Sequence, residues 1–151
     1  MIEYRITTND DIELLMVSRL TMLKEVNNLP DDYEYSKEFI DNSRDYFLNG
    51  DQTTVLALDG DKIAGCASIS YITMMPTFSH PTGKRAHLMN VYSDPAYRGQ
   101  GIAKKMVNML IDEAWSRGAT EISLDATKMG RPLYEKLGFH NSTEAMAISK
   151  K

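Results

Sequence analysis

The sequence has one cysteine, Cys66, among 151 residues, so no disulfide can form within the chain. A lone thiol favours a reducing compartment. Long apolar runs are also missing, and none approaches the length that crosses a membrane. The first residues, MIEYRITTNDD, lack the basic start and apolar core of a secretion signal. We therefore expect a cytoplasmic protein that works away from membranes.

The sequence also has fewer basic than acidic residues. The chain has 17 Lys and Arg against 21 Asp and Glu, which gives a net charge of −4. This balance argues against broad affinity for nucleic acid or anionic lipid and slightly favours a cationic ligand. No metal site is predicted. Since no repeat, linker or low-complexity tract divides the chain, residues 1–151 are predicted to form one domain.

Hydrophobic periodicity and turn residues predict a mixed α/β sheet with the element order β-α-α-β-β-β-α-β-α-β. Strands are expected at residues 2–7, in a hairpin over 53–72 that turns at Asp59-Gly60-Asp61, and at residues 86–93, 120–126 and 145–149. Helices are expected from a cap at Asn9 or Asp10 through Leu23, and at residues 36–48, 101–117 and 131–138. The segment 73–85, with two prolines and a glycine, is expected to be a loop.

The stretch YRGQGIA, residues 97–103, places two glycines between a predicted strand and a predicted helix. Glycine lets a backbone approach a ligand closely, and successive N–H groups at a helix N-terminus favour anionic oxygens. Arg98 adds a positive charge. The candidate phosphate-binding residues are Arg98, Gly99, Gln100, Gly101, Ile102, Ala103 and Lys104.

Two common phosphate-binding motifs fit these glycines poorly. A nucleoside-triphosphate P-loop requires Lys and then Ser or Thr after its second glycine, and Gly101 is followed by Ile and Ala. A dinucleotide fingerprint fits Gly99 and Gly101, and Asp125 lies at a suitable distance for its acidic residue. However, Lys104 occupies the place of the third glycine, and too little chain follows to complete a doubly wound sheet.

RGQGIA resembles the R/Q-x-x-G-x-G/A loop of the GNAT superfamily of N-acetyltransferases, with Arg98, Gly101 and Ala103 at the marked positions. The strand, loop, helix and strand around it, NVYSDPAYRGQGIAKKMVNMLIDEAWSRGATEISLDA, and the later PLYEKLGF resemble the same family. The resemblance is specific over 87–139. It implies a GNAT-like fold, with a central, mostly antiparallel sheet flanked by helices, and acetyl-CoA as the co-substrate. Its pyrophosphate would be held by the backbone from Arg98 to Lys104.

The resemblance also implies roles for individual residues in acetyl transfer to a primary amine. The backbone N–H of Val91 would meet the thioester oxygen, a strong form of catalysis. The main chain of Ser93 would pair with the pantetheine arm. Thr127 stands where many relatives have an asparagine that contacts this arm, so the sequence departs from the pattern there. Tyr134 would protonate the departing thiolate, since an ordinary phenol is protonated at neutral pH.

His87 is the candidate base, because that position often carries the proton acceptor of the family. It lies four residues before Val91, so strand alternation predicts both side chains on one face. Histidine could take the proton directly or through water, while the alternative is a structural histidine on a half-buried strand. Glu25 is a second candidate base. Cys66 is predicted to be a buried strand thiol, and His80 and His140 are predicted to be solvated.

The acceptor is expected between segments 24–35 and 74–83, which wall this site in the family. Acidic and aromatic residues of the first segment could attract a cationic amine: Glu25, Asp31, Asp32, Glu34, Tyr33 and Tyr35. The acceptor could be a small molecule or a peptide, and a homodimer is a further expectation because relatives are often dimers. The alternative function is a non-catalytic acyl-CoA-binding module, which the presence of Tyr134 disfavours.

Overall fold

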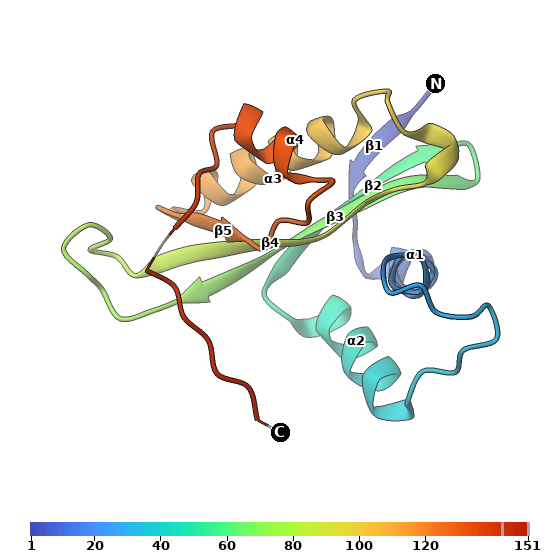
Figure 1. Cartoon of the computed structure of the whole chain (residues 1–151), viewed down its shortest axis with the longest axis horizontal. Helices are drawn as coiled ribbons and strands as arrows, with labels where there is room; N and C mark the ends of the chain where they lie inside the picture. The colour runs from blue at the N-terminus through green and yellow to red at the C-terminus, as the bar shows by residue number, and fades with distance from the viewer. Residues whose placement is uncertain (143, 151) are drawn as a thin grey trace.

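The computed structural model describes residues 1–142 and 144–150 and contains one sheet with the strand order β1-β2-β3-β4-β5 (Figure 1). The strands are β1 (Glu3–Ile6), β2 (Gln52–Asp59), β3 (Lys62–Thr73), β4 (Lys84–Ser93) and β5 (Ile122–Leu124). Neighbouring strands from β1 to β4 are antiparallel, and β4 pairs with β5 in parallel. This confirms the predicted mixed, mostly antiparallel sheet.

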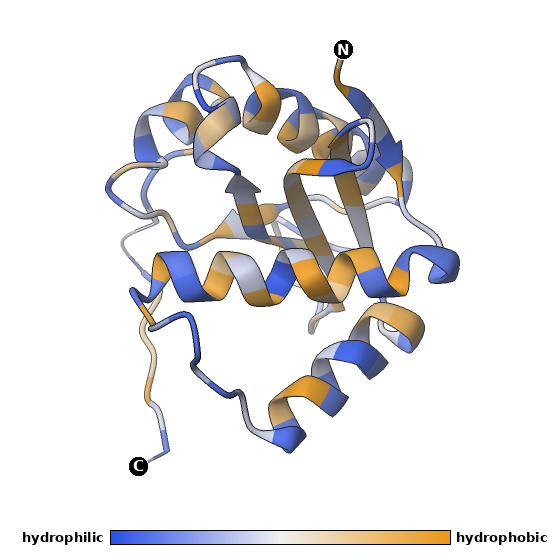
Figure 2. Cartoon of the chain, turned by 90° about the vertical axis from the view of Figure 1, so that its right-hand side faces the viewer, coloured by the Kyte–Doolittle hydropathy of each residue, from blue (hydrophilic) through white to orange (hydrophobic). Residues whose placement is uncertain are grey.

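Helices cover both faces of the sheet (Figure 1). They are α1 (Ile12–Val26), α2 (Lys37–Asn49), α3 (Ile102–Ser116) and α4 (Arg131–Lys136), with short 3-10 helices at Asn9–Asp11 and Pro95–Tyr97. The first two helices lie on one face, and α3 and α4 lie on the other. Figure 2 shows α1 along its length, with apolar turns alternating with polar ones. None of the helices in the described residues has the length and apolar character needed to cross a bilayer.

The sheet therefore has a hydrophobic core on each side. The larger core lies under α3, whose buried residues recur at helical spacing, as the sequence predicts: Ile102, Met106, Val107, Leu110 and Ala114. The second core lies under α1 and includes Leu15, Met22 and Leu56. Because β2 and β3 are covered on both faces, they form the rigid centre on which the neighbouring loops are held.

The strand β4 bends where its pairing with β3 changes register. Ser68 pairs with Met89 and Cys66 pairs with Tyr92, so one residue of β3 faces two residues of β4. Asn90 lies at this bulge and adopts a left-handed conformation, with φ of 60°. On the other side, β5 ends at Leu124, opposite Leu88, whereas β4 continues to Ser93. The pairing of β4 with β5 therefore ends two residues before the bulge.

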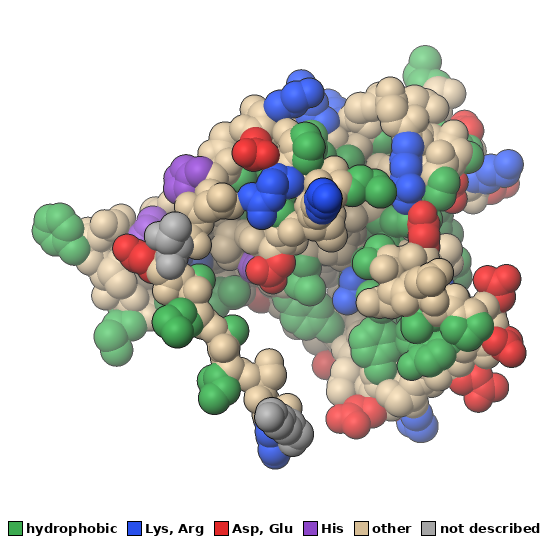
Figure 3. All heavy atoms as spheres, viewed as in Figure 1, with side chains coloured by type: hydrophobic (Ala, Val, Ile, Leu, Met, Phe, Trp, Pro, Cys, Tyr) green, Lys and Arg blue, Asp and Glu red, His purple; other side chains and the backbone are tan. Residues whose placement is uncertain are grey.

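The predicted last strand, residues 145–149, is wrong for the described part of the chain. Residues 144–150 form no strand, and the Met146 and Ile148 side chains are 97% and 99% exposed. Their alternation is typical of a strand, but a strand also needs a neighbour to hydrogen-bond, and this segment pairs with no described strand. Figure 3 shows hydrophobic side chains on this segment and on the loop between β3 and β4.

Candidate active site

The glycine loop joins β4 to α3 in a conformation that glycine suits. Gly99 and Gly101 have φ of 82° and 78°, in the left-handed region that other residues rarely adopt. A Cβ built on either residue would have no heavy atom within 4 Å, so the space in front of both is open. Gly101 immediately precedes α3, whose first backbone N–H groups have no intrahelical acceptor. The loop can therefore accept an anion at close range.

The charges around this loop also favour an anion. The first turn of α3 has no acidic residue, although acidic residues are the usual complement to the positive end of a helix. Lys104 and Lys105 lie there instead. Two like charges at the positive end of a helix are unfavourable until an anion binds, so the arrangement is suited to a phosphate ligand.

Arg98 is held at the entrance of the loop by contacts to two other elements. Its Nε donates to the Ser93 carbonyl oxygen at 3.0 Å, and its Nη2 donates to Glu25 Oε1 at 2.7 Å. Glu25, the second candidate base, thus forms an ion pair beside the glycine loop at the C-terminal end of α1.

The bulge at Asn90 reverses the alternation of side chains along β4. Val91 packs with the core under α3, like Leu88. His87 pairs across the sheet with Ser70, which faces the α2 side, so His87 and Val91 lie on opposite faces. The prediction that they share a face is wrong, because the extra residue at the bulge shifts the period of two by one.

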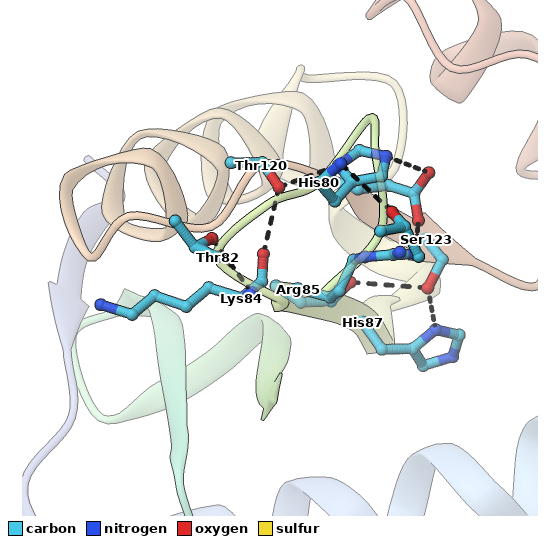
Figure 4. A network of polar contacts seen from close by, with 10 residues as sticks. His80, Thr82, Lys84, Arg85, His87, Thr120 and Ser123 are labelled. Carbon is cyan, nitrogen blue, oxygen red and sulfur yellow. Dashed lines mark hydrogen bonds and ion pairs between the residues drawn. The ribbon is translucent and has the colours of Figure 1, made fainter. Parts of the chain in front are cut away.

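His87 has a hydrogen-bond partner that the sequence did not reveal. Its Nδ1 lies 2.8 Å from Ser123 Oγ (Figure 4). Its Nε2 lies 3.7 Å from Asp125 Oδ2. The parallel register of β4 and β5 places His87 directly opposite Ser123. The serine therefore orients the imidazole near the point where the two strands separate.

The prediction that His80 is solvated is wrong. Its Nδ1 lies 2.9 Å from Thr120 Oγ1 and its Nε2 lies 3.4 Å from Glu121 Oε2 (Figure 4). These contacts attach the β3–β4 loop to the two residues before β5. Arg85 Nη1 donates to the other Glu121 oxygen at 2.7 Å. His140 is exposed, as predicted.

Tyr134 lies on α4, half-buried against the larger core. Its ring meets that of Phe139 edge to face, with centroids 5.9 Å apart. Burial raises the pKa of the phenol, so the hydroxyl keeps its proton to higher pH than an exposed tyrosine. Thr127 closes the turn before α4, because its Oγ1 accepts from the Gly130 N–H at 3.1 Å.

Cys66 is fully buried on β3, as the sequence predicts. Burial raises the pKa of its thiol to about 11. The thiol is therefore protonated at neutral pH, which excludes it as a nucleophile in this environment.

A cavity of about 440 Å³ lies between α1, α2 and the sheet. Its walls include Arg19, Phe39, Tyr46, Ser70, Met89 and Asn90. Segments 24–35 and 74–83, the predicted acceptor walls, do not line it; Glu25 and Asp31 line a separate hollow of about 400 Å³. The first cavity was not predicted from the sequence. The feature that could have indicated it is Arg19, a charged residue within the largely buried face of α1. No cluster of three or more metal-ligating side chains occurs among the described residues.

Residues 20–139 match the model of the Acetyltransferase (GNAT) family, and the chain belongs to that family. The resemblance noted from the sequence is thus confirmed. The crystal structure of a predicted acetyltransferase from Clostridium acetobutylicum, determined with acetyl-CoA, is 31% identical with a TM-score of 0.86. The similarity covers 99% of this chain and 96% of that one.

Two further relatives are named N-acetyltransferases. Glucosamine 6-phosphate N-acetyltransferase of Arabidopsis thaliana is 28% identical over 136 residues, 90% of this chain and 85% of its own. Thialysine N-epsilon-acetyltransferase of Bos taurus is 30% identical over 94 residues, 60% of this chain. The match spans only 55% of the bovine protein.

Proposed function

We propose that this chain transfers the acetyl group of acetyl-CoA to a primary amine by direct attack. The observation that carries the proposal is the glycine loop, with two left-handed glycines at the N-terminus of α3, which follows a strand β4 that continues to Ser93 after its pairing with β5 ends at Leu88. The Clostridium relative, similar over nearly its whole length, was crystallised with acetyl-CoA. A reducing compartment such as the cytoplasm suits the free thiol of Cys66.

The cofactor end of the site consists mainly of backbone groups. The N–H groups from Arg98 to Lys104 would hold the pyrophosphate, supported by the open space in front of Gly99 and Gly101. Arg98 would exchange Glu25 for a phosphate oxygen. The pantetheine arm would run between the separated strands, along the main chain near Ser93 and past Thr127.

Three groups would act on the reacting atoms. The amine nitrogen bonds to the thioester carbon while the carbon–sulfur bond breaks. The Val91 N–H, which follows the bulge, would stabilise the developing oxyanion. The Tyr134 hydroxyl would give its proton to the thiolate. His87, oriented by Ser123, would take the proton of the attacking ammonium directly or through water.

Release of free thiol from acetyl-CoA, measured with a panel of primary amines, tests this function. Amine-dependent release, with the acetylated product identified by mass spectrometry, is the expected result. Tight binding of acetyl-CoA by calorimetry with no amine-dependent release would instead support a non-catalytic acyl-CoA-binding module.

A further inference from the structure

Arg19 is the one basic side chain among the described residues that line the cavity between α1, α2 and the sheet. It projects from the middle of α1, between the buried residues Ser18 and Met22. The cavity also borders Met89 and Asn90, the two residues before Val91, and Ser70, the cross-strand partner of His87. Arg19 therefore faces a cavity on the same side of the sheet as His87, the proposed base.

The guanidinium of Arg19 is held in place by a chain of polar contacts. Its Nη1 donates to Asn90 Oδ1 at 3.1 Å, and Asn90 Nδ2 donates to Ser68 Oγ at 3.1 Å. Ser68 Oγ lies 2.7 Å from Thr54 Oγ1, which is almost fully buried. Because these hydrogen bonds connect Arg19 to the sheet, its side chain is already ordered. Arg19 therefore loses little conformational entropy when a ligand binds.

The charge of Arg19 has no carboxylate within 4 Å among the described residues. Five other arginines do pair with carboxylates: Arg5, Arg44, Arg85, Arg98 and Arg117. Arg19 is also half-buried, and desolvation lowers the pKa of its guanidinium. A buried charge without a counter-charge is unfavourable, and a planar guanidinium binds carboxylate or phosphate in a bidentate manner.

We infer that the acceptor is an amine that also carries an anionic oxygen group, a carboxylate or a phosphate, which Arg19 binds in this cavity. The inference rests on the proposed function and names its substrate class. The acidic residues Glu25 and Asp31, which were expected to attract a cationic amine, line a separate hollow. Glu38, an exposed residue of α2, is the one acidic residue among those that line this cavity, and it forms no ion pair with Arg19 in the described part of the chain.

Matched pairs of amines test the inference. The carboxylate arm compares amino acids with their amides, and the phosphate arm compares glucosamine 6-phosphate with glucosamine. We expect a lower KM for the anionic member in one arm. Arg19→Met should raise that KM by about 10- to 100-fold, in line with a hydrogen bond between charged groups, and leave the neutral member nearly unchanged. The arm that responds identifies the anionic group.

Two further variants keep the result interpretable. Arg44→Met removes an arginine of α2 that pairs with Glu13 and lies outside the cavity, so it should leave the preference unchanged. Arg19→Lys, which keeps the charge but loses the planar fork, should show a smaller loss and serves if Arg19→Met does not fold. A wild-type preference for neutral amines, or an anion preference that survives both Arg19 variants, would overturn the inference.

Binding without turnover separates this inference from the proposed function. Calorimetry with the anionic amines and no acetyl-CoA should show binding to the wild type and a large loss in Arg19→Met. If no amine releases thiol but this binding difference is found, the acetyl-transfer proposal fails and the anion site stands. If amines are acetylated but neither arm binds through Arg19, the anion site is wrong and the acetyl-transfer proposal stands.

Discussion

On the α3 side of the sheet, the candidate phosphate site consists mainly of backbone N–H groups between Arg98 and Lys104. On the α2 side, the cavity is lined by residues from α1, α2, β2, β3 and β4. The first site depends on the conformation of one short segment, which two left-handed glycines allow. The second site depends on how five elements pack. A backbone site can be found from a motif, whereas a side-chain site appears only when the elements are assembled.

Tyr134→Phe should have the largest effect, because it removes the proposed general acid. We expect kcat to fall by about 100- to 10,000-fold, with acetyl-CoA affinity retained. Since burial raises the pKa of this phenol, any alkaline loss of activity from its ionisation should occur at higher pH than for an exposed tyrosine and be absent in the variant. Steady-state kinetics across pH measures both effects.

Tyr4→Phe is the matched control, since it removes a hydroxyl from a tyrosine of β1 that is half-buried against the same core. It should leave kcat unchanged. Full activity in Tyr134→Phe with the best amine would contradict the assignment of the acid.

His87→Ala should lower kcat/KM by about 100-fold, at the low end of the range for acid–base catalysis, because water can replace part of its role. The acidic limb of the pH–rate profile should also flatten. His80→Ala is the control, because this histidine belongs to the β3–β4 loop and makes similar contacts to Thr120 and Glu121, just before β5. If the acidic limb persists unchanged in His87→Ala, the proton goes elsewhere and His87 is a structural residue.

Gly101→Val should weaken acetyl-CoA binding by about 10- to 100-fold, since a β-branched residue resists a φ of 78° and its side chain would enter the open space. Gly60→Val in the β2–β3 turn is a matched control, with φ of 60° and equally open space. Both variants should lose stability in thermal unfolding. Only Gly101→Val should lower the affinity for acetyl-CoA, measured by calorimetry. If both variants bind acetyl-CoA equally well, the assignment of this loop as the phosphate site is wrong.

Glu25→Gln should have the smallest effect, and it should strengthen acetyl-CoA binding, whereas Gly101→Val weakens it. Removing the carboxylate frees Arg98 for a phosphate oxygen, so affinity for acetyl-CoA should rise by up to about fivefold, as the loss of an exposed ion pair allows. The gain should shrink at high salt. Glu13→Gln, on the same helix but paired with Arg44, should change nothing. A fall in affinity would mean that Glu25 positions Arg98 for binding.

Much of the backbone site could be predicted because its determinants are local. The glycines of residues 97–103 and the apolar spacing of α3 lie close together in sequence, and the family motif covers Tyr134 as well. The hairpin at Asp59-Gly60-Asp61 formed for the same reason, since a tight turn depends on adjacent residues. The buried, protonated Cys66 followed from its place in an apolar strand.

The sequence by itself therefore determined the glycine loop, the helix that follows it and most of the element order, because each depends on residues within one or two turns of chain. The tertiary structure alone decided the rest. The bulge at Asn90 moved Val91 to the opposite face from His87, and the parallel register brought Ser123 to that histidine. Arg19 reached a cavity wall only when α1 packed across the sheet, because side-chain sites depend on contacts between distant segments.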